Sequence, residues 1–138
     1  DSVLTSFPDR DREFQCGPAV GAPLINHRIG ADDFLLDHLG PGFTGLYFSA
    51  AGKVNAATAA LFAGLGVGHG RFTPLVIART PAHNVPMQIV DQDGSLARAY
   101  GAGDGTFYLV RPDRHVCARW LALRPDEVGQ AFAAALGG

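Results

Sequence analysis

The amino-acid sequence predicts an α/β domain built on one mixed β-sheet with helices on both faces. Two observations support this prediction. A strand–helix–strand unit lies within residues 43–79, and a pair of strands within residues 107–120 is followed by a closing helix from Pro125. The chain has 138 residues, which suits a single compact domain of roughly 100–150 residues.

The beginning of the chain is expected to be a linker or extended arm, residues 1–22, that leads into a domain of residues 23–138. The arm contains a run of charged residues, Asp9–Glu13, followed by scattered glycine and proline without helical or strand periodicity. A short helix is predicted at Ala31–Leu39, because an acidic pair can cap its first turn and a Gly-Pro-Gly sequence ends it.

The strand–helix–strand unit consists of two apolar segments on either side of a helical pattern. Phe43–Ser49 and Thr73–Arg79 lack alternation, which predicts strands that are covered on both faces. The helical stripe between them is formed by Val54, Thr58, Leu61, Phe62 and Leu65. The helix is expected to end at Gly66, with Gly64–Gly70 as a flexible loop. A crossover of this length favours a parallel, right-handed pair of strands.

The hairpin is predicted from two strands that flank a short connection. Phe107–Arg111 and His115–Trp120 are separated by Pro, Asp and Arg, which suit a type I turn. In the expected register the facing pairs are Arg111 with His115, Leu109 with Cys117, and Phe107 with Arg119. The other face of the hairpin is expected to hold Tyr108, Val110, Val116, Ala118 and Trp120. Cys117 is therefore expected to be buried.

Two further helical segments complete the order of elements. Asp91–Gly94 predicts a turn, and Ser95–Tyr100 predicts one or two helical turns. The last helix begins at Pro125, has two acidic residues in its first turn, and ends at Gly137. A β-α-β unit followed by a hairpin and a closing helix is a thioredoxin-like order.

Composition and charge exclude several classes of protein. The net charge is −2 and no segment clusters Lys or Arg, so no nucleic-acid partner is expected. The longest apolar stretch, 56–65, is far shorter than the roughly 20 residues of a membrane span. The chain has only two cysteines, which favours a reducing cytoplasm. It uses arginine almost to the exclusion of lysine, which favours a bacterial source.

Four segments of the chain resemble one protein family. They are Gly21–Leu24, Leu36–Thr44, Val90–Ala102 and Tyr108–Trp120, and the last of them reads YLVRPDRHVCARW, similar to YLIRPDGHVAARW in the family. From Gly17 onward the chain resembles the C-terminal thioredoxin-like domain of FAD-dependent aromatic-ring monooxygenases, of the phenol hydroxylase and 3-(3-hydroxyphenyl)propionate hydroxylase type.

The resemblance implies that the chain is the tail of a larger flavoprotein. The FAD and NAD(P)H chemistry, hydroxylation of a phenolic ring, would lie in an upstream flavin-binding domain of the same polypeptide. The tail would serve packing and homodimer contact. The sequence departs from the family at Arg114, where the family has glycine, so either Arg114 adopts a left-handed conformation or the turn differs.

The chain itself is expected to contain no catalytic, cofactor-binding or metal-binding residue. Thiol catalysis needs a cysteine after the first strand, where this chain has Ser49–Val54. Cys117 is interpreted as a small core residue, and Cys16 as exposed and incidental. No segment has the glycine spacing of a dinucleotide-binding turn. The five histidines lack the spacing of metal ligands: His27, His38, His69, His83 and His115.

Two alternatives stay open at this point. One is a free-standing thioredoxin-like or peroxiredoxin-like protein with thiol activity at Cys117 or Cys16. The other is a small binding module with the loops Gly64–Gly70 and Ala82–Met87 as its rim.

Three charged residues of the hairpin region also permit two interpretations. Arg111, Asp113 and Arg119 form either an internal salt bridge that closes the turn or a contact with the flavin domain or a second subunit.

Overall fold

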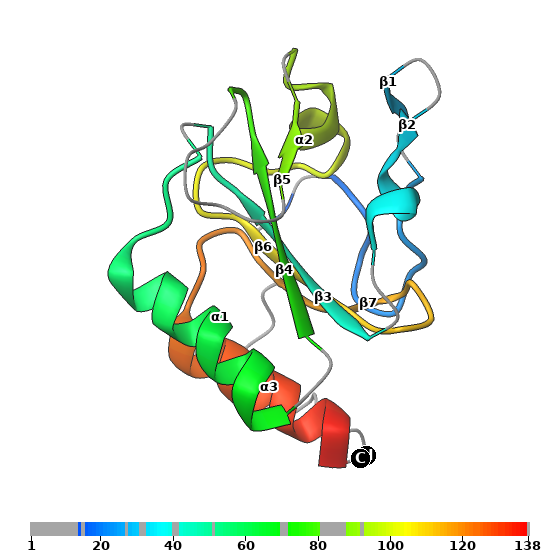
Figure 1. Cartoon of the computed structure of the whole chain (residues 1–138). Coiled ribbons are helices and arrows are strands. Elements are labelled where there is room, and N and C mark those ends of the chain that lie inside the picture. Colours follow the sequence, from blue (N-terminus) through cyan, green and yellow to red (C-terminus); the bar gives the residue numbers. More distant parts are fainter. Residues whose placement is uncertain are drawn as a thin grey trace.

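The computed structural model (Figure 1) describes residues 14, 16–26, 28–30, 33–39, 42–50, 52–69, 72–80, 88–91 and 93–137. The strands are β1 (Arg28–Gly30), β2 (Asp33–Phe34), β3 (Phe43–Phe48), β4 (Phe72–Ala78), β5 (Gln88–Val90), β6 (Phe107–Val110) and β7 (Val116–Trp120). The helices are the 3-10 turn η3 (Leu35–His38), α1 (Ala56–His69), α2 (Ser95–Ala99) and α3 (Pro125–Gly137).

The core of the fold is a mixed sheet of β3 to β7 in the order β5-β4-β3-β6-β7. β3 pairs in parallel with β4 and antiparallel with β6, while β5 is parallel to β4 and β7 is antiparallel to β6. All six residues of β3 are buried, as the absence of alternation predicted. The predicted β-α-β unit, hairpin and closing helix are confirmed.

Helices cover both faces of this sheet. α1 and α3 lie side by side (Figure 1) over a cluster in which Phe62, Phe107 and Phe132 are buried. The opposite face carries α2, η3 and a cluster that contains Leu35, Leu96, Tyr100 and Tyr108. We call the cluster that contains Leu35 and Tyr108 the first cluster, and the cluster that contains Phe62 and Phe132 the second cluster. Because each face has its own apolar layer, both sides of β3 are excluded from water.

The short helix predicted at Ala31–Leu39 is wrong at its start. Asp33 and Phe34 form β2, an extended strand that pairs antiparallel with β1, and only one 3-10 turn follows, at Leu35–His38. The amide of Leu36 in that turn is held by the Asn26 side chain at 3.0 Å. The pairing of β2 with β1 satisfies backbone hydrogen-bonding groups of these residues. A prediction from helix-capping residues alone considers only local sequence and therefore misses this pairing.

Two expectations about the middle of the chain also need correction. α1 does not end at Gly66 but runs to His69, so the flexible loop predicted at Gly64–Gly70 is wrong over residues 64–69, and Gly70 lies outside the described residues. Buried Leu65 keeps this end of the helix on the second cluster. The short edge strand β5 was not predicted. The loop Ala82–Met87 lies outside the described residues.

The hairpin register is correct at the turn and wrong beyond it. The Arg111 amide donates to the His115 carbonyl at 2.9 Å, as expected. A β-bulge then shifts the pairing, and the observed pairs are Val110 with Val116, Leu109 with Ala118, Tyr108 with Arg119, and Phe107 with Trp120. Cys117 is the extra residue of the bulge.

The bulge decides which side chains of β7 enter which cluster. Trp120 lies in the second cluster with Phe107 and Cys117, whereas it was expected on the opposite face. Arg119 is displaced to the side of Tyr108. Burial of the large indole on the α3 side, where its Nε1 donates to Glu127 at 2.9 Å, favours this arrangement.

Candidate functional site

The segment that leads into the domain, residues 16–25, is attached to the edge of the sheet, and we call it the leading segment. The Gly21 amide donates to the Val116 carbonyl at 2.8 Å, and the Val116 amide donates to the Ala22 carbonyl at 2.9 Å. Farther along, Pro23 forms an antiparallel bridge with His115. The leading segment therefore extends the sheet beyond the start of β7 and covers part of its edge.

Arg119 on β7 binds the start of the leading segment. Its side chain is buried, with the residue only 6% exposed. Its Nη1 donates to the Cys16 carbonyl at 3.1 Å and to the Tyr108 hydroxyl at 3.2 Å. The guanidinium also lies 4.0 Å from the ring centroid of Phe14. A planar guanidinium can stack on a ring and donate hydrogen bonds in its plane, which an ammonium cannot do equally well.

Two tyrosines continue this network toward the end of the leading segment. The Tyr108 hydroxyl donates to the Tyr100 carbonyl at 2.5 Å, and the Tyr100 hydroxyl donates to the Ile25 carbonyl at 2.6 Å. Burial raises the pKa of the Tyr100 phenol, so its proton stays available for this bond. Arg119, Tyr108 and Tyr100 together hold both ends of the leading segment, and we call them the clamp.

Two glycines allow the leading segment to cross the clamp at close range. Gly17 has φ +92°, and a Cβ atom there would lie 2.5 Å from the Tyr100 carbonyl oxygen and 2.6 Å from the Tyr108 hydroxyl oxygen. Gly101 has φ +62°, and a Cβ atom there would lie 2.7 Å from the Cys16 carbonyl oxygen. Both the backbone conformation and the available space thus require glycine.

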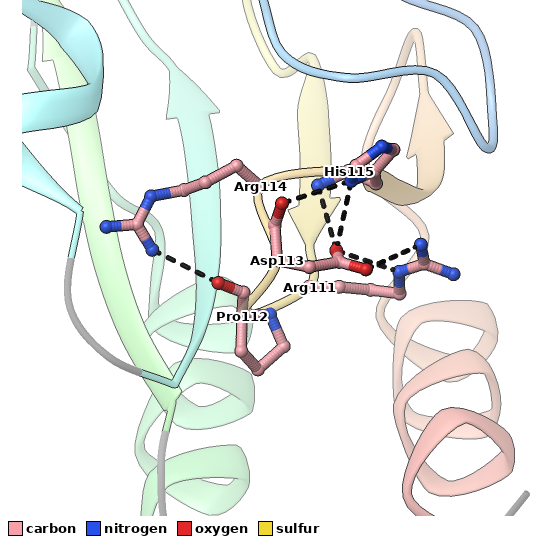
Figure 2. Close-up of polar contacts among 5 residues, drawn as sticks. All are labelled: Arg111, Pro112, Asp113, Arg114 and His115. Atoms are coloured by element: carbon pink, nitrogen blue, oxygen red, sulfur yellow. Dashed lines mark hydrogen bonds and ion pairs between the residues drawn. The ribbon is translucent and has the colours of Figure 1, made fainter.

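The hairpin turn contains the other charged residues expected to matter (Figure 2). The guanidinium of Arg111 binds the carboxylate of Asp113 through two hydrogen bonds, of 2.9 and 3.2 Å. The same carboxylate accepts the His115 amide at 3.1 Å. The Arg111 hydrogen bond holds the pKa of Asp113 below its usual value. Arg111 and Asp113 therefore form the internal salt bridge that closes the turn, with about half of each side chain exposed.

Arg114 carries the left-handed conformation that its position in the turn requires. Its φ is +69°, and it is the one non-glycine residue in the described part of the chain with a positive φ. Its Nη1 donates to the Pro112 carbonyl at 3.2 Å (Figure 2). Its amide donates to the Arg111 carbonyl at 2.9 Å. The turn keeps the geometry expected with glycine, and the departure from the family sequence is accommodated as local strain.

The structure thus separates the three charged residues that the sequence singled out. Arg111 and Asp113 meet in the turn, whereas Arg119 binds the leading segment. The tyrosines of the clamp and the two glycines were not predicted as part of a site. Their only local signal is a Gly-Pro pair at residues 17 and 18, because the partners lie far apart in the sequence.

The two cysteines lie where the sequence predicted. Cys117 is buried in the second cluster, and burial raises the pKa of its thiol. Cys16 is exposed, and its thiol donates to the Arg98 carbonyl at 3.5 Å. A raised pKa leaves less of the nucleophilic thiolate at neutral pH.

A hollow of about 280 Å³ lies at the carboxyl ends of β3 and β4. Phe48, Ile77 and Ala102 contribute apolar surface, and Arg79 and Asp104 contribute polar groups. This is the edge where a thiol enzyme of this fold would need its cysteine, and Ser49 occupies the position after β3. The Ser49 hydroxyl donates to the Lys53 carbonyl at 2.9 Å.

Neither a metal cluster nor a membrane span is found in the part of the chain that the structure describes. Among those residues, no group of three or more His, Cys, Asp or Glu side chains could hold a metal ion. No described helix has the length and apolarity needed to cross a membrane.

These features define an α/β domain of the thioredoxin-like class. The model of the HcaD C-terminal domain family matches residues 17–135, and the chain belongs to this family. This membership confirms the resemblance to the C-terminal domain of flavin-dependent hydroxylases. No curated protein matches the chain with significance.

Three solved structures illustrate the likeness of fold. Peroxidoxin BcpB from Mycobacterium tuberculosis matches with a TM-score of 0.63 and 18% identity, over 86% of this chain and 96% of that one. The substrate-free rebeccamycin biosynthetic enzyme RebC matches with a TM-score of 0.60 and 20% identity, over 89% of this chain and 20% of that one. Aklavinone-11 hydroxylase, in a ternary complex with FAD and aklavinone, matches with a TM-score of 0.59 and 20% identity, over 87% of this chain and 21% of that one. The thioredoxin-like fold is confirmed, and the chain spans about a fifth of the length of the last two proteins.

Proposed function

We propose that this chain is the non-catalytic C-terminal domain of an FAD- and NAD(P)H-dependent aromatic hydroxylase that acts on a phenolic substrate. The observation that carries the proposal is the match to the HcaD C-terminal domain family, which begins at Gly17, next to the Cys16 carbonyl that Arg119 of the clamp holds. The chain is also similar in fold to part of a hydroxylase that was solved with FAD. Its role would be packing and homodimer contact.

The clamp gives this role a physical basis. A flexible linker would let two domains sample many relative orientations, whereas a segment held at both ends by partly buried hydrogen bonds restricts them. Residues 1–22 remain the proposed linker and residues 23–138 the proposed domain. Within the proposed linker, Cys16, Gly21 and Ala22 are attached to the sheet by hydrogen bonds.

The proposal assigns the cofactors and the chemistry to the part of the polypeptide that precedes this domain. FAD and NAD(P)H would bind to that upstream flavin domain, which would be the main partner of this chain. The chain itself would have no catalytic, cofactor-binding or metal-binding residue and no nucleic-acid or membrane partner. The compartment would be the bacterial cytoplasm.

The decisive experiment is to identify the native polypeptide. Intact mass and the gene sequence upstream of Asp1 should reveal a chain several times longer with a dinucleotide-binding fingerprint. The purified full-length protein should contain FAD by absorbance and should oxidise NAD(P)H in the presence of a phenolic substrate. Light scattering should give the mass of a dimer. A native chain that lacks a flavin-binding domain contradicts the proposal.

A free-standing thiol enzyme is the second candidate, favoured by the likeness to peroxidoxin BcpB. Its weakness is the placement of the thiols. Cys117 is buried with a raised pKa, and the residues from Ser49 to Val54 include no cysteine. Turnover of a peroxide or disulfide by the purified chain, abolished by a Cys117→Ala or Cys16→Ala substitution, would establish this alternative.

A further inference from the structure

The first cluster is covered by shorter elements than the second cluster. On its side of the sheet lie the four-residue turn η3, the five-residue helix α2 and the leading segment (Figure 1). The second cluster is covered by α1 and α3, which have 14 and 13 residues. Short elements contribute few side chains to the layer above a sheet, so they cover less apolar surface than long helices do.

Apolar side chains at the border of the first cluster are therefore only partly covered. Three that pack against it are partly buried, and two more are 36% and 41% exposed. We call these five residues the apolar rim: Phe14, Leu36, Leu39, Phe34 and Ile25. Phe34 directly precedes Leu35, which is fully buried in the cluster. The Ile25 carbonyl accepts a hydrogen bond from Tyr100 of the same cluster.

Exposure of large apolar side chains is concentrated near the beginning of the chain. Among the described residues four such side chains are exposed, and three of them precede residue 35: Val20, Ile25 and Phe34. The fourth, Leu121, follows β7. Single exposed apolar residues are common on protein surfaces, whereas a group of them around one cluster is typical of an interaction surface.

The polypeptide enters the described part of the domain beside this rim. The ring of Phe14 packs edge-on against Tyr108, with the ring centroids 5.5 Å apart, and Tyr108 packs in the same way against Tyr100, at 5.2 Å. The Tyr100 hydroxyl then donates to the Ile25 carbonyl at 2.6 Å. Only two aromatic rings thus separate Phe14 from Ile25, so the polypeptide that precedes Phe14 is joined to the domain next to the rim.

A neighbouring domain of the same polypeptide fits this surface better than a second copy of the chain. Stable interfaces between separate proteins involve about 20–30 residues on each side, far more than the rim provides. A domain that is joined covalently needs less contact, because its effective concentration at the rim is in the millimolar range. The proposed parent protein provides such a domain, since this chain spans about a fifth of the length of RebC and of aklavinone-11 hydroxylase.

We propose that the apolar rim docks on the domain that precedes this one in the same polypeptide. This inference rests on the proposed function and adds the surface through which the two domains pack. Docking removes the exposed apolar surface of Ile25 and Phe34 from water, which is favourable. Together with the clamp, it fixes the orientation of the two domains at the point where the polypeptide enters.

The test uses photo-crosslinking in the full-length protein. Phe34→p-benzoylphenylalanine places a photoreactive group on the rim, and Leu121→p-benzoylphenylalanine is the matched control, because Leu121 is 37% exposed and lies outside the rim. Irradiation should join residue 34 to peptides that precede Asp1 in the same polypeptide. The yield should be at least about tenfold higher than at residue 121, because docking holds the partner surface against the probe. Ile25→p-benzoylphenylalanine provides a second position on the rim.

Charged substitutions test whether the rim holds the two domains together. Ile25→Asp combined with Phe34→Asp should increase the radius of gyration of the full-length protein in small-angle X-ray scattering, because carboxylates in an apolar interface oppose docking. Leu121→Asp should leave the radius of gyration unchanged. Protection of the β3 amides from hydrogen exchange verifies that the domain is folded in each variant.

Three results of the crosslinking overturn the inference. They are crosslinks from residue 34 to residues 1–13, crosslinks to a second copy of the chain, and a yield no higher than at residue 121. A native polypeptide without a preceding domain contradicts the proposed function itself. A preceding domain that is present but does not crosslink to residues 25 and 34 contradicts this inference alone.

Discussion

The guanidinium of Arg119 lies 4.0 Å from the ring centroid of Phe14, although the two residues stand near opposite ends of the sequence. The same guanidinium donates to the Cys16 carbonyl and the Tyr108 hydroxyl. One buried cation therefore connects the beginning of the leading segment to the last strand of the sheet. Loss of this cation should loosen both.

Arg119→Ala should destabilise the chain and release the leading segment. The substitution removes a buried cation and leaves the Tyr108 hydroxyl and the Cys16 carbonyl without this donor, so we expect a loss of about 2–3 kcal/mol in the free energy of unfolding. Hydrogen exchange should accelerate at the amides of Gly21 and Leu24. The control Arg124→Ala, at an exposed position, should change the stability by less than about 0.5 kcal/mol. Equal effects of the two substitutions would contradict the clamp.

Gly17→Ala and Gly21→Ala form a matched pair that separates steric overlap from backbone strain. Both glycines have positive φ, +92° and +87°. A Cβ atom at residue 17 would overlap two clamp oxygens, whereas at residue 21 it meets nothing within 4 Å. Gly21→Ala should therefore lower the stability by about 1 kcal/mol and Gly17→Ala by about 3 kcal/mol or more. Urea denaturation of both variants checks this, and similar losses would indicate that the close crossing does not constrain the fold.

Thiol labelling should distinguish the two cysteines. Under native conditions only Cys16 should react, and both should react in denaturant, because Cys117 is buried and its pKa is raised. A Cys16→Ser variant should then show no labelling until it unfolds. Rapid modification of Cys117 in the folded protein would support the thiol-enzyme alternative.

Asp113→Asn should reduce the dependence of stability on acid pH. The pKa of Asp113 is lowered in the folded state by Arg111, so its contribution is present above the unfolded pKa and is lost as the pH falls through the folded value. The pair is exposed, so the effect should be small, about 0.5 kcal/mol or less, and appear below about pH 4. Unfolding free energies from about pH 6 to about pH 2 test this. The difference in unfolding free energy between wild type and variant should shrink in about 1 M NaCl, because salt screens the exposed ion pair. Identical dependence of the unfolding free energy on pH in the two proteins would refute the prediction.

Much of the fold could be predicted because its elements have local signals. The uninterrupted apolar residues of β3, the helical stripe of α1 and the Pro-Asp-Glu start of α3 each predict an element from neighbouring residues alone. The four segment matches also indicate the family, because they follow one another in the same order over most of the chain. β5 escaped prediction because three residues carry too little periodicity.

Residue spacing and turn chemistry were sufficient to predict the class of fold, since they depend on neighbouring residues. At Arg114 they left two alternatives open, and the structure shows the left-handed one. Cys117 is buried as predicted, although the pairing that predicted its burial is shifted by the bulge. The register of β7 depends instead on tertiary packing, because the bulge directs Trp120 to one face and Arg119 to the other. Packing also brings Phe14 and Tyr108 to Arg119, places Tyr100 against Tyr108, and forms the hollow beside Arg79. These contacts join residues that are distant along the chain, so their geometry is set by the close packing of the whole sheet and not by any local pattern.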